Sequence, residues 1–354
     1  MAGKSADILR LQRVIPRMRG KHVGVLGDVM LDRYLWGNAS RLSPEAPVPV
    51  VDFVAQSECL GGAGNVAANL AALGAKVEAF GVVGSDEAGR GLQGCLRAAG
   101  ILYQGVVPDA KRVTTVKTRI IARHHQVVRV DHERKEALRP ETEEKLLRAL
   151  FAALKHLDAL VISDYDKGLI TDAFADRVLS ACHRLEVPVF VKPKRSRLYA
   201  YRGARVIICN VMEAGFFVTR ELGDEKSVEE AGRALLAHFG CNAVIITRGE
   251  NGMNLVEESS PRQFHISATN TEVTYERVGQ PGVEGDGAGR QVFDRTGAGD
   301  AVLSVVALAA TAGAELRDAA VLANAAAGVV VGKLGTASVT PEELTARVSE
   351  TRQT

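Results

Sequence analysis

The stretch NVAANLAALGAKVEAFGVVG, residues 65–84, decides the fold class. Its first half, 65–74, has the apolar pattern of a helix. Its second half, 76–84, is apolar enough to form a strand covered on both faces. A helix that leads directly into a buried strand predicts a parallel sheet covered by helices.

The same alternation continues along the chain in both directions. Further buried strands are predicted at 23–28, 158–164, 187–192, 205–209 and 242–247. Further helices are predicted at 87–100, 140–156 and 227–240. Repeated strand–helix–strand order predicts an α/β fold, with a mostly parallel central sheet and helices on both of its faces.

Two segments depart from this alternation. Residues 48–56 and 113–131 alternate apolar with polar side chains and lack a crossover helix. They are therefore predicted to be antiparallel strands with one solvent-exposed face, forming a small β-lid beside the main sheet. Residues 279–289 are rich in Gly and Pro and are predicted to be a flexible loop.

Composition excludes several classes of protein. The 354 residues include 44 Lys and Arg against 42 Asp and Glu, a formal net charge of +2, so neither nucleic acid nor a membrane is an expected partner. The five cysteines form no CxxC pair, which argues against a disulfide framework or a zinc site and favours the cytoplasm. No secretion signal or membrane-spanning stretch is predicted, so a small-molecule partner is expected.

A second stretch, DRTGAGDAV at 294–302, predicts an anion site. It opens an apolar helix, and Gly297, Ala298 and Gly299 leave the backbone accessible at the positive end of that helix. Asp300 would repel a bound phosphate, so a role as general base accounts for it better than a role in binding. The alternative is that Asp300 only caps the helix.

The stretches 61–75 (GGAGNVAANLAALGA) and 294–302 resemble the paired signatures of ribokinase-like (PfkB) sugar kinases. The resemblance implies one kinase domain over 1–354, a three-layer α/β/α sandwich with lid strands within about 33–56 and 112–131. It implies Asp300 as the catalytic base and Gly297, Ala298 and Gly299 as the anion hole. A flexible insertion is expected at about 268–290.

The resemblance also implies a nucleotide side that binds ATP and Mg²⁺. Asn210 and Glu213 match the family's Asn-x-x-Glu element and would hold magnesium through water. The residues implied to bind the nucleotide are Asn210, Glu213, Thr247, Gly249, Gly252 and Asn324. Two alternatives stay open: Asn210 as a helix cap, and Asn324 as a packed interior amide. A monovalent cation is a further cofactor that the resemblance allows.

Residues 27–51, 162–171 and 324–344 resemble one subgroup, the heptose 7-phosphate kinases of lipopolysaccharide-core synthesis. This implies transfer of the ATP γ-phosphate to the anomeric hydroxyl of D-glycero-D-manno-heptose 7-phosphate, giving the 1,7-bisphosphate, an intermediate toward ADP-heptose. A kinase for another sugar or sugar phosphate is one alternative. A non-catalytic sugar or nucleotide sensor is the other.

The same resemblance implies a sugar site. The residues implied to contact the sugar are Asp28, Asp32, Gly61, Gly62, Asn65 and Asp164. Candidates to bind the sugar phosphate are Arg33, Lys117, Arg119, Arg129 and Lys167. The alternative for any one of these basic residues is a solvated surface charge.

Two residues depart from the family pattern. Arg295 replaces a smaller residue, and Lys192 stands where relatives commonly have an aspartate. Some relatives carry a fused nucleotidyltransferase domain, and this chain is expected to perform only the kinase step. A homodimer formed through the β-lid is the assembly that relatives suggest.

Overall fold

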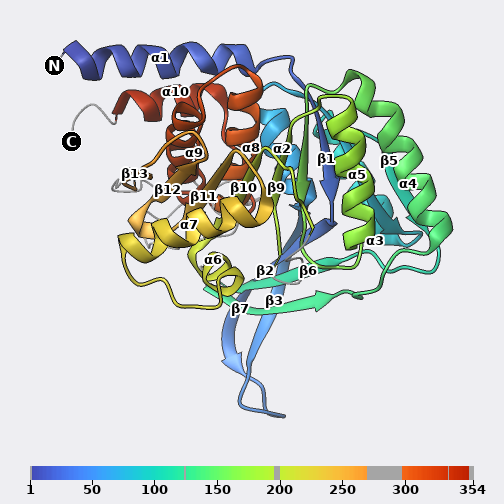
Figure 1. Cartoon of the computed structure of the whole chain (residues 1–354). Helices are drawn as coiled ribbons and strands as arrows, with labels where there is room; N and C mark the ends of the chain where they lie inside the picture. Colours follow the sequence, from blue (N-terminus) through green and yellow to red (C-terminus); the bar gives the residue numbers. More distant parts are fainter. Residues whose placement is uncertain (1, 123–124, 195–199, 269–296, 334, 351–354) are drawn as a thin grey trace.

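The computed structural model describes residues 2–122, 125–194, 200–268, 297–333 and 335–350. Two sheets organise these residues. The larger sheet contains nine strands in the order β13-β12-β11-β10-β9-β8-β1-β4-β5, and the smaller sheet contains four in the order β3-β2-β6-β7. Figure 1 shows the smaller sheet projecting from the body that the larger sheet forms.

The main sheet is mostly parallel. Its strands are β1 (His22–Gly27), β4 (Lys76–Gly84), β5 (Leu102–Asp109), β8 (Ala159–Ser163), β9 (Val189–Lys192), β10 (Val206–Asn210), β11 (Ala243–Thr247), β12 (Met253–Glu257) and β13 (Phe264–Ile266). All pairs from β11 to β5 are parallel, whereas β12 is antiparallel to both of its neighbours. The antiparallel edge follows from the tight turn after β11, which leaves no room for a crossover helix.

Helices cover both faces of this sheet. One face packs against α1 (Ala2–Met18), α2 (Ala63–Ala72), α3 (Glu87–Ala98), α8 (Ala298–Thr311), α9 (Leu316–Val331) and α10 (Pro341–Glu350). The other face packs against α4 (Pro140–Ala153), the 3-10 turn η1 (Leu154–His156), α5 (Asp172–Arg184), α6 (Val211–Phe217) and α7 (Glu225–Phe239). Helices on both faces confirm the three-layer α/β/α sandwich.

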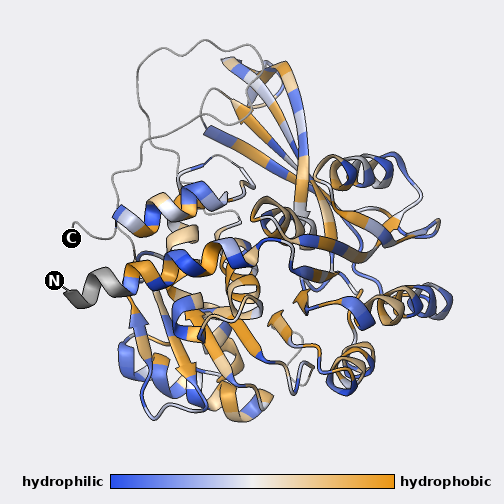
Figure 2. Ribbon diagram, turned by 90° about the horizontal axis from the view of Figure 1, so that it is seen from above, coloured by the Kyte–Doolittle hydropathy of each residue, from blue (hydrophilic) through white to orange (hydrophobic). Residues whose placement is uncertain are grey.

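Each face has its own hydrophobic core. Along β8, Val161 lies in one core while Leu160 and Ile162 lie in the other, because successive side chains of a strand point to opposite faces. In Figure 2 the strands of the main sheet are mostly hydrophobic, and hydrophilic residues concentrate on the outer helices. This two-sided burial is the physical reason why the strands read as continuous apolar runs.

The smaller sheet forms the lid. Its strands are β2 (Val29–Leu42), β3 (Pro49–Gly62), β6 (Val116–Ala122) and β7 (His125–His132). β2 follows β1 almost without interruption, and β3 leads into α2, so the lid grows out of the carboxyl end of the central strand. The sequence predicts antiparallel lid strands, but β2 and β6 are parallel. They are separated by about 70 residues that contribute α2, α3, β4 and β5 to the main body, so no hairpin constrains their direction.

The sequence-based boundaries agree closely with the structure. The strand expected at 76–84 has those bounds, and the helix expected at 65–74 is α2 at Ala63–Ala72. The expected insertion at 268–290 and Arg295 lie outside the described residues, apart from Ala268. Among the helices that the structure describes, none is long and apolar enough to cross a membrane.

Candidate active site

The candidate residues gather at the carboxyl ends of five adjacent strands. Asp28 follows β1, Asp164 follows β8, Lys192 ends β9, Asn210 ends β10 and Thr247 ends β11. Because these strands are neighbours in the order β11-β10-β9-β8-β1, the implied nucleotide residues occupy one side and the implied sugar residues the other. Ligands of open α/β sheets bind at this edge.

Asp300 lies in the first turn of α8, which reaches the centre of this edge. α8 is built almost entirely of buried Ala, Val and Leu, so it is a core helix whose amino end is fixed by packing. Asp300 is 4 % exposed, and its side chain accepts hydrogen bonds from Asn65 Nδ2 at 3.0 Å and Tyr165 OH at 2.6 Å. Among the residues that the structure describes, no side chain caps α8, so the alternative role of Asp300 as a helix cap does not describe its contacts.

The glycines on either side of Ala298 let two polar side chains, Asn65 and Lys192, approach the tip of α8 closely. Gly297 has φ of 89°, a left-handed conformation that favours glycine, and a Cβ built there would lie 2.9 Å from Asn65 Nδ2. A Cβ on Gly299 would lie 3.1 Å from Lys192 Nζ. The first amides of a helix have no partner within it, and residues 297–299 are only partly buried. This tip therefore fits an anion such as a phosphate.

Lys192 and Tyr165 are site residues that the sequence did not identify. Lys192 Nζ forms an ion pair with Asp300 Oδ1 at 2.8 Å and lies 5.4 Å from the centre of the Tyr165 ring. Burial lowers the pKa of Lys192, but the charge of Asp300 outweighs burial and raises it, so the ammonium stays protonated. Two features of the sequence could have identified them. Lys192 is a lysine at the end of an apolar strand, and Tyr165 directly follows Asp164, the aspartate after β8.

Asp28 and Asp164 form a second buried group of carboxylates. Asp28 Oδ2 accepts hydrogen bonds from the backbone amides of Tyr165 at 2.9 Å and Lys167 at 3.2 Å. Asp164 accepts from Tyr201 OH at 2.7 Å and from the Asp166 amide at 2.7 Å. Burial, followed by the negative charge of Asp164, raises the pKa of Asp28 to about 6.

We expect Asp28→Asn to stabilise the fold more at pH 8 than at pH 4.5. The folded pKa lies above the unfolded value of 3.8, so the wild type loses stability as pH rises through about 6, and the difference is on the order of 1–3 kcal/mol. Asparagine keeps an oxygen for the two backbone amides and has no charge to bury. Thermal melts of both proteins at the two pH values measure the effect, and an equal gain at both would contradict it.

Asp32 lies on the lid and pairs with Arg119 on the neighbouring strand. Asp32 is 3 % exposed, Arg119 is 5 % exposed, and Arg119 NH1 lies 2.9 Å from Asp32 Oδ1. A Cβ on Gly61 would lie 2.8 Å from the Asp32 carboxylate, and a Cβ on Gly62 would lie 2.4 Å from the Asp28 backbone oxygen. The two glycines therefore let β3 approach the Asp32 carboxylate and the Asp28 backbone closely.

The other basic candidates fall on two different faces of the lid. Lys117 is the register partner of Asp32 on β2 and of Asp131 on β7, so the three share a face. Arg33 follows Asp32 on β2, so its side chain points to the opposite face of the lid, where it contacts Glu58 at 2.8 Å. The structure therefore does not bring Arg33 together with the other basic candidates.

Carboxylates neutralise the remaining basic candidates. Glu133 contacts Lys167 at 2.6 Å and Lys117 at 3.4 Å, and Asp131 contacts Lys117 at 3.0 Å and Arg129 at 2.8 Å. These five side chains form the charge network of the lid. A sugar phosphate binding here would compete with the two carboxylates for the three cations.

Asn210 and Glu213 form a capping box at the start of α6. Asn210 Oδ1 accepts from the Glu213 amide at 2.8 Å, and Glu213 Oε2 accepts from the Asn210 amide at 3.0 Å. Glu213 Oε1 also contacts Lys194 Nζ at 2.8 Å. The cap is therefore a real role of Asn210. Each carboxylate oxygen has two lone pairs, so Glu213 can still accept a bond from a metal-bound water, which suits magnesium.

The remaining nucleotide candidates shape the turn after β11. Gly249 has φ of 60° and Gly252 has φ of 74°, and a Cβ on Gly252 would lie 2.0 Å from the Ile266 backbone oxygen. Thr247 is the register partner of Asn210 on the adjacent strand. Asn324 Nδ2 donates to the Ser267 backbone oxygen at 2.9 Å, so it acts at least as a packed interior amide.

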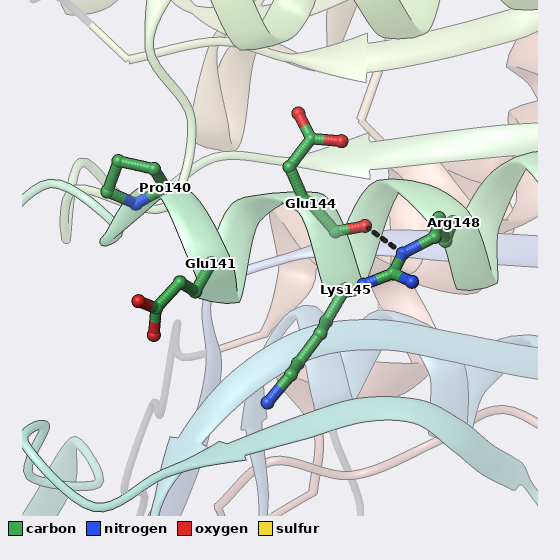
Figure 3. A pocket seen from close by; sticks show the side chains of 5 residues that line it. All are labelled: Pro140, Glu141, Glu144, Lys145 and Arg148. Carbon is green, nitrogen blue, oxygen red and sulfur yellow. Dashed lines mark hydrogen bonds between the residues drawn. The ribbon is translucent and has the colours of Figure 1, made fainter.

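A shallow hollow of about 500 Å³ lies elsewhere, on the outer surface of α4. Figure 3 shows its lining side chains, which are Pro140, Glu141, Glu144, Lys145 and Arg148. All of them belong to one exposed helix and none belongs to the five strand ends that carry the candidate residues. We assign no role in the chemistry to this hollow, because charged side chains on an outer helical face are normally solvated.

Comparison with known proteins identifies what this architecture resembles. The sequence model of the pfkB family carbohydrate kinases matches residues 21–343. The chain is 40 % identical over 338 residues to the bifunctional protein HldE of Geotalea uraniireducens, covering 96 % of this chain and 65 % of that protein. It is 43 % identical over 337 residues to the bifunctional protein HldE of Caulobacter vibrioides, covering 95 % and 65 % respectively. The chain thus spans slightly less than two thirds of these relatives.

Solved structures share the fold. A crystal structure of a putative ribokinase from Agrobacterium tumefaciens matches with a TM-score of 0.71 at 21 % identity, covering 95 % of this chain and 99 % of that one. The phosphofructokinase-2 from Escherichia coli matches with a TM-score of 0.72 at 17 % identity, covering 95 % and 100 %. Their likeness shows a ribokinase-like fold.

Proposed function

Because the chain belongs to the pfkB family of carbohydrate kinases, we propose that it transfers the γ-phosphoryl group of ATP to the anomeric hydroxyl of D-glycero-D-manno-heptose 7-phosphate. The observation that carries the proposal is the buried Asp300 carboxylate beside the glycine-lined tip of α8. A base and an anion site in contact are the two groups that phosphoryl transfer to a hydroxyl requires.

Asp300 would accept the proton of the sugar hydroxyl as its oxygen attacks the γ-phosphorus. The bond between that phosphorus and the bridging oxygen breaks, and ADP leaves with the electron pair. The amides at residues 297–299 would hold the phosphoryl oxygens, and Asn65 would keep the Asp300 carboxylate in place. Asn210 and Glu213 would hold magnesium through water, which offsets phosphate charge when bound. A monovalent cation would add to the same offset.

On the nucleotide side, Thr247, Gly249 and Gly252 would approach the phosphates and ribose, and Asn324 would flank the adenine. On the sugar side, the sugar would lie between the main sheet and the lid. Asp28 and Asp32 would accept hydrogen bonds from its hydroxyls. Gly61 and Gly62 would bring the backbone to the same ligand, and Asp164 would lie beside Asp28 in the same buried group of carboxylates.

The 7-phosphate would bind in the charge network of the lid. Lys117, Arg129 and Lys167 lie there, and Arg119 lies next to Lys117 on the same face of β6. A dianionic phosphate can displace Asp131 and Glu133 from these cations. Arg33 contacts Glu58 on the opposite face of β2, so the proposal does not include it.

The heptose assignment also rests on the resemblance of residues 27–51, 162–171 and 324–344 to heptose 7-phosphate kinases. A kinase for another sugar phosphate remains the second candidate, because the charge network would bind a phosphate on a different sugar. The paired Asp300 and Lys192 disfavour a sensor, since a protein that only binds has no need of a buried base.

Measuring ADP release in a coupled assay tests this proposal. With ATP and magnesium present, we expect turnover with heptose 7-phosphate to exceed that with fructose 6-phosphate or ribose by at least about tenfold, because only the first fits both phosphate and heptose contacts. Faster turnover with fructose 6-phosphate would replace the heptose by another sugar phosphate. No release with any sugar would favour the sensor.

We further propose a homodimer formed through the lid, in the cytoplasm. Large apolar side chains are exposed on lid strands β3 and β7, including Phe53, Val54, Val128 and Val130. Exposed apolar patches of this kind commonly mark protein contacts. The five cysteines are all free, which suits a reducing compartment.

A further inference from the structure

We propose that Lys192 is a further catalytic residue, whose ammonium group binds the phosphoryl group that is transferred. The inference rests on the proposed kinase activity and concerns a residue that the family resemblance does not assign.

The position of Lys192 supports this role. It ends β9, which lies between β8 on the sugar side and β10 on the nucleotide side. A phosphoryl group that moves from nucleotide to sugar must cross the space above this central strand. Lys192 Nζ lies 3.1 Å from where a Cβ on Gly299 would be, so the ammonium touches the tip of α8.

Electrostatics also favour an additional anion at this point. The amino end of α8 carries a partial positive charge, and the Lys192 ammonium adds a full one beside it. Asp300, the described carboxylate in contact with Lys192, supplies one negative charge. Lys194 lies nearby, 5.5 Å from the centre of the same Tyr165 ring, although Glu213 pairs with it. The positive charges of Lys192 and the amino end of α8 therefore exceed the single negative charge of Asp300, and the negative charge of a phosphate can offset the excess.

Lys192 can reach the phosphoryl group without leaving Asp300. An ammonium has three N–H donors, and one of them is used by Asp300 Oδ1 at 2.8 Å. The ammonium also makes a cation–π contact with the Tyr165 ring, whose centre lies 5.4 Å from Nζ. Lys192 keeps its proton throughout the reaction, while Asp300 takes the proton of the sugar hydroxyl. The lysine thus contributes charge and position only.

Nucleotide binding measured by calorimetry tests the proposal without any sugar. With magnesium present, wild-type protein should bind both ADP and the non-hydrolysable ATP analogue AMP-PNP. Lys192→Met should weaken AMP-PNP binding by about tenfold or more, the usual loss for a hydrogen bond to a charged group, and leave ADP binding within about twofold. Lys145→Met, on exposed α4, is the matched control and should change neither affinity.

A second pair of variants guards against misfolding. Lys192→Met leaves Asp300 buried without its cation, which can destabilise the protein. Comparing Asp300→Asn with the double variant Asp300→Asn/Lys192→Met avoids the unpaired carboxylate, because neither protein has one at this site. Asp300→Asn leaves the Lys192 ammonium without its partner, so circular dichroism is used to check that both variants fold. The double variant should show the same selective loss of AMP-PNP affinity.

The outcomes separate this inference from the proposed function. Equal effects on ADP and AMP-PNP, or no effect on either, would reduce Lys192 to a positioning residue for Asp300 and overturn the inference. Wild-type protein that binds neither nucleotide would instead refute the kinase itself. Selective loss in both comparisons supports a direct contact with the γ-phosphoryl group.

Discussion

Replacing Asp300 by asparagine is expected to lower turnover by about 100-fold or more while the protein still folds and binds nucleotide. Asparagine keeps the shape of the side chain and an oxygen that can accept from Lys192 and Tyr165, but it cannot take a proton from the sugar. The loss should appear in kcat, with little change in the KM for ATP, because the missing interaction acts in the transition state. Steady-state kinetics and circular dichroism measure the two parts of the prediction.

Asp318→Asn provides the matched control for this experiment. Asp318 is also 4 % exposed and also pairs with a cation, Arg10, at 2.7 Å, but it lies at the start of α9 away from the strand ends. Its replacement should leave turnover within about twofold of the wild type, because an ion pair with an exposed arginine contributes little free energy and Asp318 does not contact the candidate active site. Near-normal turnover in Asp300→Asn would remove the general base from the mechanism.

Replacing Arg119 by methionine is expected to lower the free energy of unfolding by about 3–5 kcal/mol, because it leaves the buried Asp32 carboxylate without its cation. Arg119 also lies over the Tyr34 ring at 5.3 Å, so the change removes packing between lid strands as well. Burial already raises the pKa of Asp32 against the opposing charge of Arg119, which indicates how strongly this carboxylate depends on its partner. Urea denaturation measures the loss.

Two further variants define what this loss means. Arg177→Met removes an exposed cation that pairs with Glu144 on α4, and it should leave the midpoint of denaturation unchanged within error. Asp32→Asn combined with Arg119→Met should recover part of the lost stability, since no unpaired charge is then buried. A loss in Arg177→Met as large as that in Arg119→Met would show that burial does not decide the strength of these pairs.

Several site residues could be predicted because they follow strands or open helices. Asp28 and Asn210 come directly after apolar runs, and Asp300 opens an apolar helix, so the strand order alone brings them to one edge. Lys192 and Tyr165 also follow strands. They were missed because a lysine and a tyrosine near a strand end are most often solvated or packed, and their contact with Asp300 spans 108 and 135 residues.

The lid shows a different limit of sequence reasoning. Alternation predicted its strands, yet it could not give the parallel pairing of β2 with β6. That register decides which side chains share a face, because a shift by one residue moves every side chain to the other side of a sheet. Arg33 was therefore grouped with basic residues from which the sheet separates it.

The sequence by itself determined the layers of this protein and the segments that supply its candidate site. Hydrophobic periodicity is a local property, and it records directly whether a strand is covered on one face or on two. Only the tertiary structure decided which charges neutralise one another: Lys192 with Asp300, Arg119 with Asp32, and both Lys117 and Lys167 with Glu133. Such pairs depend on distances of a few ångströms between residues far apart in the chain, and these distances are fixed only when the strands and helices pack.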